Sequence, residues 1–289
     1  MSKTAWVFPG QGSQTAGMGL DWLTHPHAQA RFAEAEAILG WSVVEICRPP
    51  APDLAQTRYT QPCLYVVESI LADLYSEYLP DYLAGHSLGE YVALYRAGVV
   101  DFATGLAVVK RRAELMDQVS GGKMVALLEP DREQLTTLLA QNPDVVLAND
   151  NHPGQVVISG TPAAVDAVLR EITVKRAVPL AVSGAFHSPL MAPPAEALNQ
   201  YLETIPFADA QIPVLSNTDP TPTRAGDILK QKLRNQMTTG VRWRETVLNL
   251  AALGVKRVVE LGPGKVLTGL VKRTAPEIEL VNISSIPSL

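Results

Sequence analysis

YLAGHSLGEY, at residues 82–91, is the stretch of sequence that decides how this chain is interpreted. A short apolar run ends at Gly85, and a helical spacing of apolar residues begins at Leu88. Between them stands G-x-S-x-G, which in a strand-turn-helix context predicts a nucleophile elbow with Ser87 at its tip. Such a turn lifts the serine hydroxyl clear of the backbone, beside free N–H groups at the helix start. The alternative is a serine that only caps a helix after a tight turn.

Strands and helices alternate on both sides of this elbow. Apolar runs predict strands at 5–8, 82–84, 213–216, 255–261 and 278–283. Helical periodicity predicts helices at 64–79, around 88–97 and 102–116, and at 194–205, 227–237, 243–253 and 266–273. Strands that alternate with helices imply an α/β fold with a mostly parallel sheet and helices on both of its faces.

The middle of the chain has a different pattern. Strands are predicted at 124–128, 145–148, 156–159 and 177–182, and helices at 131–139 and from Thr161-Pro162 onward. The resulting order β-α-β-β-α-β is typical of a ferredoxin-like unit. We therefore expect a small ferredoxin-like domain at 123–187, inserted into a large α/β catalytic domain made of 1–122 and 188–289.

Composition and charge exclude several classes of protein. Hydrophobic residues make up 47% and charged residues 18%, which argues against a disordered, collagen-like or coiled-coil chain. The net charge of −5 argues against nucleic acid as a partner. Apolar runs are too short for a membrane helix or a signal peptide. The two cysteines, Cys47 and Cys63, lack metal-site or disulfide spacing, so we expect buried thiols, no metal and a reducing, cytoplasmic location.

A serine nucleophile needs a base to remove its proton, and histidine is the usual one. The chain has five histidines, which are His25, His27, His86, His152 and His187. Two of them flank a proline in an expected surface turn, and one lies in an expected loop. His86 adjoins Ser87, and neighbours around a sharp turn point apart. By elimination the base is His187, which lies where the chain leaves the inserted domain, although a hydrogen-bonded junction histidine is the alternative.

A second glycine-rich segment, GQGSQ at 10–14, follows the first strand. It is not a dinucleotide-binding G-x-G-x-x-G, because Thr15 stands where the third glycine is required, and it is not a P-loop. Elbow enzymes hold the developing oxyanion with two backbone N–H groups. One comes from the residue after the serine, here Leu88, and Gln11 is a candidate for the other. A flexible turn is the alternative.

The third element is a run of cations, Lys110-Arg111-Arg112, within the helix that follows the elbow helix. Helical geometry directs Arg111 away from the apolar stripe and puts Lys110 and Arg112 on its borders. A solvated charged face is the default interpretation. A border arginine that reaches into a cleft can instead hold a carboxylate bidentately.

Six motifs in a fixed order extend these observations to the whole chain. They are FPGQGSQ at 8–14, TQP at 60–62, GHSLGEY at 85–91, NHPGQVVISG at 151–160, GAFHSPLM at 184–191 and GPGKVLTGL at 262–270. With these motifs the chain resembles the bacterial malonyl-CoA:acyl carrier protein transacylases, acyltransferases of fatty acid and polyketide synthesis. The resemblance implies a large hydrolase-like α/β domain with an inserted ferredoxin-like domain.

The resemblance also implies a reaction. Ser87 matches the serine that is acylated and His187 its base, and Gln11 and Leu88 match the backbone donors of the oxyanion hole. A malonyl group would pass from malonyl-CoA to Ser87 and then to the phosphopantetheine thiol of acyl carrier protein. This implies a cytoplasmic enzyme that acts on malonyl-CoA and acyl carrier protein, with no cofactor or metal and no nucleic acid or membrane partner. We expect a monomer.

Four further positions match substrate-binding or positioning residues of the family. Arg112 matches the arginine that binds the malonyl carboxylate. Gln236 matches the residue whose backbone carbonyl orients the histidine, although the sequence around it departs from the commoner forms. Asn151 matches a polar residue of the cleft. Phe186 resembles the malonyl-selecting form of the motif, in which the ring disfavours a branched extender unit.

Two other functions remain open at this level. The first is an esterase or thioesterase that uses the same elbow, although no histidine occurs in the last hundred residues, where hydrolases of this kind place their base. The second is a carrier-binding subunit without catalysis, which the presence of both Ser87 and His187 disfavours.

Overall fold

The computed structural model describes residues 2–75, 77–182 and 184–285 and contains a parallel and an antiparallel β-sheet. The larger sheet has the strand order β7-β2-β1-β8-β9, and every neighbouring pair is parallel. In that order its strands are Val214–Leu215, Tyr82–Gly85, Lys3–Phe8, Val255–Leu261 and Glu279–Ile283. The mixed α/β class and the parallel sheet predicted from the alternating pattern are confirmed.

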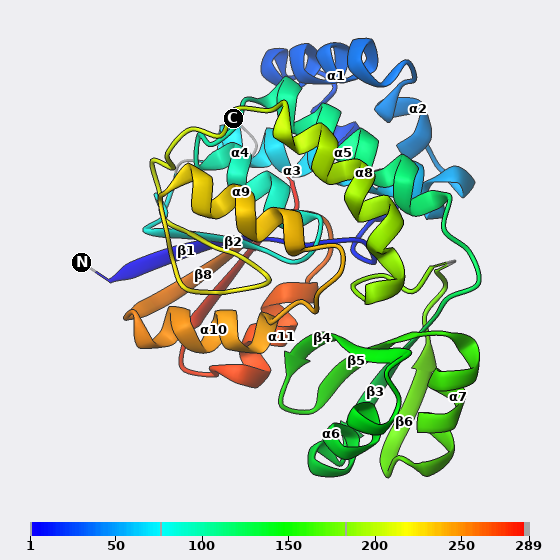
Figure 1. The fold of residues 1–289 in the computed structure, drawn as a ribbon. Helices are drawn as coiled ribbons and strands as arrows, with labels where there is room; N and C mark the ends of the chain where they lie inside the picture. Colours follow the sequence, from blue (N-terminus) through cyan, green and yellow to red (C-terminus); the bar gives the residue numbers. More distant parts are fainter. Residues whose placement is uncertain (1, 76, 183, 286–289) are drawn as a thin grey trace.

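Helices cover both faces of the parallel sheet (Figure 1). Side chains of β1 alternate between them, because Trp6 and Phe8 join one buried cluster while Ala5 and Val7 join the other. The first cluster includes helices α1, α2, α3, α4, α5, α8 and α9, at Pro26–Leu39, Val43–Cys47, Thr57–Leu74, Gly89–Arg96, Phe102–Asp117, Ala192–Glu203 and Gly226–Asn235. The second includes α10 at Trp243–Ala252 and α11 at Val266–Thr274. A strand buried on both faces explains the uninterrupted apolar run of β1.

The smaller sheet is antiparallel, with the order β4-β5-β3-β6. Its strands in that order are Val145–His152, Gln155–Gly160, Lys123–Pro130 and Val174–Pro179. Helices α6 (Arg132–Gln141) and α7 (Pro162–Glu171) pack on it around a third buried cluster, which includes Leu127, Leu135 and Val165. Figure 1 shows this unit as a separate lobe beside the parallel sheet.

Several element boundaries differ from the sequence predictions. Helix α3 runs from Thr57 to Leu74 rather than from 64 to 79, and it contains Pro62. Strand β4 continues to His152 rather than ending at 148, and Asn149, Asp150 and His152 pair with β5, with two irregularities in the register. Strand β6 lies three residues earlier than expected. His25 caps α1, and His27 lies in that helix rather than in a turn.

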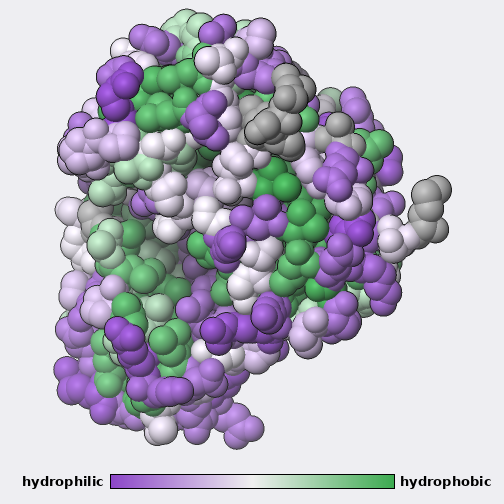
Figure 2. All heavy atoms as spheres, turned by 180° about the vertical axis from the view of Figure 1, so that it is seen from behind, coloured by the Kyte–Doolittle hydropathy of each residue, from purple (hydrophilic) through white to green (hydrophobic). Residues whose placement is uncertain are grey.

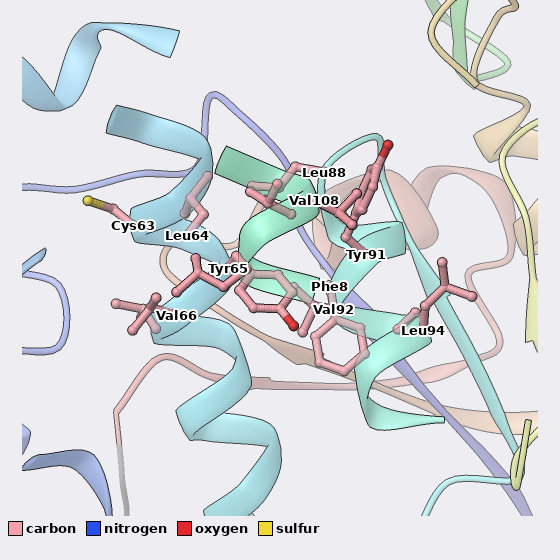
Figure 3. Close-up of a cluster of buried hydrophobic side chains, with 14 of the residues drawn as sticks. Phe8, Cys63, Leu64, Tyr65, Val66, Leu88, Tyr91, Val92, Leu94 and Val108 are labelled. Carbon is pink, nitrogen blue, oxygen red and sulfur yellow. The ribbon is translucent and has the colours of Figure 1, made fainter. Parts of the chain in front are cut away.

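The elbow helix α4 has a rigid support. Leu88, which caps the helix, and the helix residues Tyr91 and Val92 belong to the same buried cluster as Leu64 and Tyr65 of α3 (Figure 3). A close-packed support of this kind holds Ser87, two residues before the helix, in one place.

A hollow lies between the small lobe and the parallel-sheet part of the molecule. In the space-filling view from behind, hydrophobic side chains gather inside it (Figure 2). Among the described residues, no helix combines the length and apolar character needed to cross a membrane. No group of three or more His, Cys, Asp or Glu side chains that could hold a metal ion occurs in this part of the chain either.

Candidate active site

Ser87 occupies a strained position between β2 and α4. Its φ of 52° lies in the left-handed region, which costs a non-glycine residue about 1–3 kcal/mol. The flanking glycines are required by close packing. A Cβ on Gly85 would lie 1.9 Å from the backbone carbon of Gly89, and a Cβ on Gly89 would lie 2.0 Å from the Phe8 oxygen. The G-x-S-x-G pattern therefore forms a tight elbow with the serine at its tip.

His187 lies directly against the serine. The Ser87 Oγ is 2.8 Å from the His187 Nε2. The His187 Nδ1 lies 2.9 Å from the carbonyl oxygen of Gln236 and 3.2 Å from that of Thr239. Carbonyl oxygens only accept hydrogen bonds, so Nδ1 carries the proton and the Nε2 lone pair faces the serine hydroxyl. This is the tautomer that can remove a proton from Ser87.

The imidazole of His187 is kept neutral. The ring is buried, and burial lowers its pKa to about 3, with a smaller contribution from the positive charge of Arg112. Hydrogen bonds to the two carbonyls oppose this shift but do not outweigh it. A neutral imidazole at ordinary pH is a proton acceptor that needs no prior deprotonation.

Arg112 is a buried cation at the same point. Only 1% of its surface is exposed, although the sequence pattern put it on the border of the apolar stripe. Its Nη1 donates to the Gln61 Oε1 at 2.6 Å, and its Nη2 donates to the Ser87 Oγ at 3.1 Å and the Gln236 Oε1 at 3.2 Å. None of the ion pairs among the described residues includes Arg112. A buried cation whose hydrogen-bond partners are all neutral favours an anionic ligand.

The segment that contains Gln11 passes close to the elbow. A Cβ on Gly10 would lie 2.4 Å from the His86 oxygen, so only glycine allows this approach. The Gln11 side chain is held by the hydroxyl of Thr57 at 3.1 Å. Within the described ranges, neither the Gln11 nor the Leu88 backbone N–H donates a hydrogen bond to the protein. Both donors are thus available to an oxygen bound beside Ser87.

A cavity of about 90 Å³ joins these groups. Ser87, Arg112, His187, Gln11 and Phe186 all line it. Phe186 is 5% exposed and forms part of the wall.

Asn151 lines an adjoining cavity of about 190 Å³, which also has Gln11 and His86 in its wall. The Asn151 Oδ1 lies 3.0 Å from the His86 Nε2, and its Nδ2 donates to Gln155 at 3.2 Å. The His86 ring thus contacts the small sheet, while the ring hydrogen-bonded to the Ser87 hydroxyl is that of His187.

The sequence analysis gave no role to three residues that brace this site, although Gln61 and Glu90 lie within two of its motifs. The Asn217 side chain accepts from the Ser87 N–H at 2.7 Å and donates to the Gly85 oxygen at 2.6 Å. Glu90 is buried, and burial raises its pKa while it accepts from the Gln236 side chain at 2.7 Å. Gln61 orients Arg112. One usable signal was that Asn217 follows the carboxyl end of a parallel strand, where binding residues gather.

Comparison with known proteins places the chain in a family. The model of the acyl transferase domain matches residues 5–289. The chain belongs to the acyl transferase family. A malonyl CoA-acyl carrier protein transacylase of Synechocystis is 58% identical over 289 residues, with 99% of each sequence covered. The resemblance indicated by the six motifs is thereby confirmed.

Solved structures agree with this assignment. The crystal structure of the Synechocystis malonyl-CoA:ACP transacylase superposes with a TM-score of 0.96 at 58% identity and covers 98% of both chains. A type II PKS acyl-carrier protein in complex with its malonyl-transacylase matches with a TM-score of 0.92 at 37% identity, covering 98% of this chain and 96% of that one.

Proposed function

We propose that the chain transfers a malonyl group from malonyl-CoA to the phosphopantetheine thiol of an acyl carrier protein and so supplies extender units for fatty acid synthesis. The observation that carries this proposal is the buried Arg112 cation, 3.1 Å from the nucleophile and without a carboxylate partner among the described residues. The far carboxylate of a malonyl group lies one methylene beyond the reacting carbonyl. Attachment to Ser87 therefore keeps it beside the guanidinium. The names of the most similar relatives point to the same substrates.

The first half-reaction forms a malonyl ester on Ser87. The Ser87 oxygen attacks the thioester carbonyl carbon while its proton passes to the His187 Nε2, 2.8 Å away. The carbonyl oxygen becomes an oxyanion, and the N–H groups of Gln11 and Leu88 stabilise it. When the carbon–sulfur bond breaks, the imidazolium returns the proton to the sulfur, and CoA leaves as its thiol.

The second half-reaction runs the same steps with a different thiol. The carrier's phosphopantetheine sulfur loses its proton to His187 and attacks the ester carbonyl. The carbon–oxygen bond to Ser87 breaks, the serine regains the proton from the imidazolium, and the malonyl group leaves as a thioester on the carrier. Asn151 and Phe186 shape the acyl and pantetheine sides of the cleft, and the Phe186 ring disfavours a branched acyl group.

Gln236 serves as the residue that orients the base. Its backbone carbonyl accepts from the His187 Nδ1–H, in the place where a hydrolase triad has a carboxylate. A neutral acceptor fixes the tautomer without adding a negative charge to the site. Burial and the charge of Arg112 lower the pKa of His187, and the hydrogen bond to the Gln236 carbonyl opposes this shift only in part, so the ring stays neutral.

The finer description of the fold is also a proposal. The large part, 1–122 and 188–289, is hydrolase-like, and 123–187 is an inserted ferredoxin-like domain. The strand order of the small sheet supports the second assignment. When its strands are numbered 1 to 4 along the chain, they lie side by side in the order 2-3-1-4, which is the strand order of a ferredoxin-like sheet. Two pairs of cations, Lys256-Arg257 and Lys272-Arg273, are candidates for contact with an acidic carrier. Lys272-Arg273 is the better one, since Arg273 lines a cavity together with Lys175 and Arg176 of the small sheet, whereas Arg257 pairs with Glu279. We also propose a cytoplasmic monomer that needs no metal or cofactor.

One experiment separates transfer from hydrolysis. The protein is incubated with malonyl-CoA, with and without holo acyl carrier protein, and the products are measured over time. Transfer predicts malonyl-loaded carrier and little free malonate, and Ser87→Ala abolishes both products. Rapid release of free malonate with no loaded carrier would overturn the proposal in favour of a hydrolase. Binding of the carrier without any reaction would favour a non-catalytic subunit.

A further inference from the structure

The loop at 236–241, between α9 and α10, sets the orientation of His187. Both carbonyls that accept from the His187 Nδ1–H belong to this loop, at Gln236 and Thr239. A shift of the loop would take both carbonyls away from the Nδ1–H, and the Nδ1–H tautomer of His187 would then no longer be favoured. What holds the loop in place therefore matters for the base.

The small sheet holds this loop from the other side of the cleft. The Val241 N–H donates to the Ala148 oxygen at 2.8 Å, and the Asp150 N–H donates to the Val241 oxygen at 2.9 Å. These bonds form an isolated parallel bridge between β4 and the loop. A Cβ on Gly240 would lie 2.4 Å from the Leu147 oxygen, so the backbones are in close contact. Strand β4 thus reaches the loop within two residues of a His187 acceptor.

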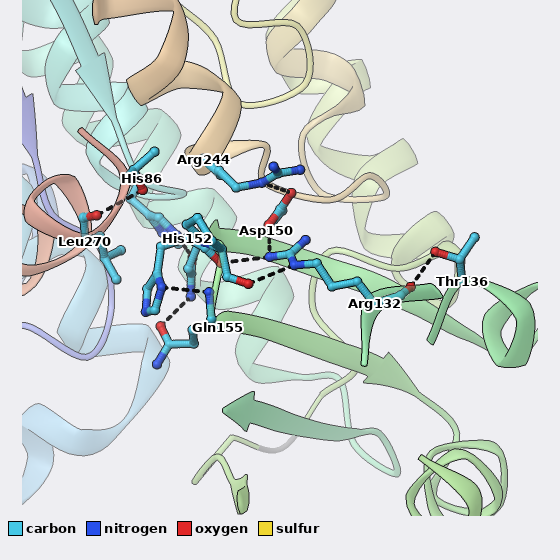
Figure 4. Close-up of polar contacts among 12 residues, drawn as sticks. His86, Arg132, Thr136, Asp150, His152, Gln155, Arg244 and Leu270 are labelled. Atoms are coloured by element: carbon cyan, nitrogen blue, oxygen red, sulfur yellow. Dashed lines mark hydrogen bonds and ion pairs between the residues drawn. The ribbon is translucent and has the colours of Figure 1, made fainter. Parts of the chain in front are cut away.

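An ion pair between β4 and α10 reinforces this contact. Asp150 lies two residues before the end of β4, and its Oδ2 accepts from the Arg244 Nε of α10 at 2.9 Å. Its other oxygen accepts from the Arg132 Nη2 at 2.8 Å, within the small domain. Arg132 also donates to the oxygens of His152 and Pro153. Figure 4 shows Asp150 between the two arginines.

Because it is partly buried, this ion pair contributes more to the stability of the contact than a fully exposed pair would. The Asp150 side chain is 16% exposed, against 38% for Arg244. Both carboxylate oxygens have cationic partners, so the group is fixed in position rather than free to rotate. A network of several charges contributes more to stability than an isolated exposed ion pair does.

We propose that Asp150 and Arg244 are positioning residues that hold the 236–241 loop against β4 and so keep its carbonyls on His187. They touch neither the substrate nor the reacting atoms. Their effect on the reaction passes through the Gln236 and Thr239 carbonyls to the tautomer of the base. The inference rests on the proposed function in one respect, which is that His187 acts as the base.

The test compares two substitutions in the first turn of α10. Arg244→Gln removes the ion pair across the cleft. Glu245→Gln is the matched control, because Glu245 pairs with Arg242 at 2.7 Å on the same side of the cleft. For each variant, three quantities are measured on the full chain: the ¹⁵N chemical shifts of the His187 ring, the single-turnover rate of serine acylation by malonyl-CoA, and the thermal midpoint.

The inference expects the Arg244→Gln ring to lose part of its Nδ1–H population and acylation to slow by roughly three- to tenfold, less than the ~10²-fold that a full ångström of misplacement can cost. The KM for malonyl-CoA stays within about twofold, because no substrate contact is removed. Arg244→Lys restores part of the rate. Asp150→Asn gives the same ring signature should Arg244→Gln fail to fold.

Wild-type ring shifts and acylation rate in both Arg244→Gln and Asp150→Asn would overturn the inference, as would an equal effect of Glu245→Gln. A lowered thermal midpoint with an unchanged ring and rate would reduce the pair to a purely structural role and so overturn it too. Failure of the proposed function has a different signature, which is a His187→Ala variant that acylates at the wild-type rate.

Discussion

Removal of the Arg112 guanidinium provides a quantitative test of substrate selection. Arg112 is 1% exposed and donates to the Ser87 Oγ at 3.1 Å, so a bound malonyl carboxylate meets a desolvated cation. Truncation of one partner of a buried, hydrogen-bonded charge pair costs about 2–5 kcal/mol. Since about 1.4 kcal/mol corresponds to a factor of ten in rate, Arg112→Ala should slow malonyl acylation by roughly 30-fold to several thousand-fold.

The ratio of two substrates isolates the carboxylate contact. Loss of the hydrogen bonds from Arg112 to Gln61 and Gln236 affects any acyl group, whereas only malonyl has a second carboxylate. Rates of acylation by malonyl-CoA and acetyl-CoA are measured by quenched intact-mass spectrometry. Acetyl transfer should change far less than malonyl transfer, and Arg112→Lys should fall between, because it keeps the charge but loses the bidentate geometry. Equal losses for both substrates would refute the reasoning.

Three further predictions follow from the site. Because folded His187 resists protonation down to a pKa of about 3 while the unfolded ring titrates near 6.5, the free energy of unfolding should fall as pH drops through that window. Denaturant titrations should show that His187→Gln loses about 2 kcal/mol less than wild type between pH 7 and pH 5, and identical losses would contradict the buried neutral ring. Phe186→Ala should raise the methylmalonyl-to-malonyl rate ratio by roughly tenfold, measured by competition between the two CoA esters, unless the ring plays no part in selection. Gly89→Ala should destabilise the fold by about 3 kcal/mol or more, because its Cβ would lie 2.0 Å from the Phe8 oxygen, and a denaturation midpoint equal to wild type would rule out that close contact.

The parts of the site that depend on local sequence could be predicted. G-x-S-x-G specifies the elbow because its geometry needs glycines within four residues of one another, and the structure has that turn at Ser87. Strand β8 was predicted with its observed bounds, Val255–Leu261, because β-branched and apolar residues, among them Val258, Val259 and Leu261, precede the turn signal Gly262-Pro263. His187 could be singled out because few histidines compete for the role.

What the sequence could not predict depends on contacts between distant segments. Helical periodicity predicts only that Arg112 lies on the border of an apolar stripe. Arg112 is a buried cation because Gln61 and Gln236, from other parts of the chain, pack against it and accept its hydrogen bonds. The residues at 149–152 have the composition of a turn, yet pairing with β5 and with Val241 keeps them in β4. Helix α1 was not predicted because two of its four buried residues are alanines, which leaves a weak apolar stripe.

The most direct test of the central claim is to locate the covalent adduct. The protein is exposed to malonyl-CoA, quenched, digested and mapped by mass spectrometry, and a parallel sample is chased with holo acyl carrier protein before the quench. The account predicts a single malonyl ester on the peptide that contains Ser87, and its disappearance during the chase as loaded carrier forms. A malonyl group on another residue, or an ester on Ser87 that the carrier thiol does not remove, would contradict it.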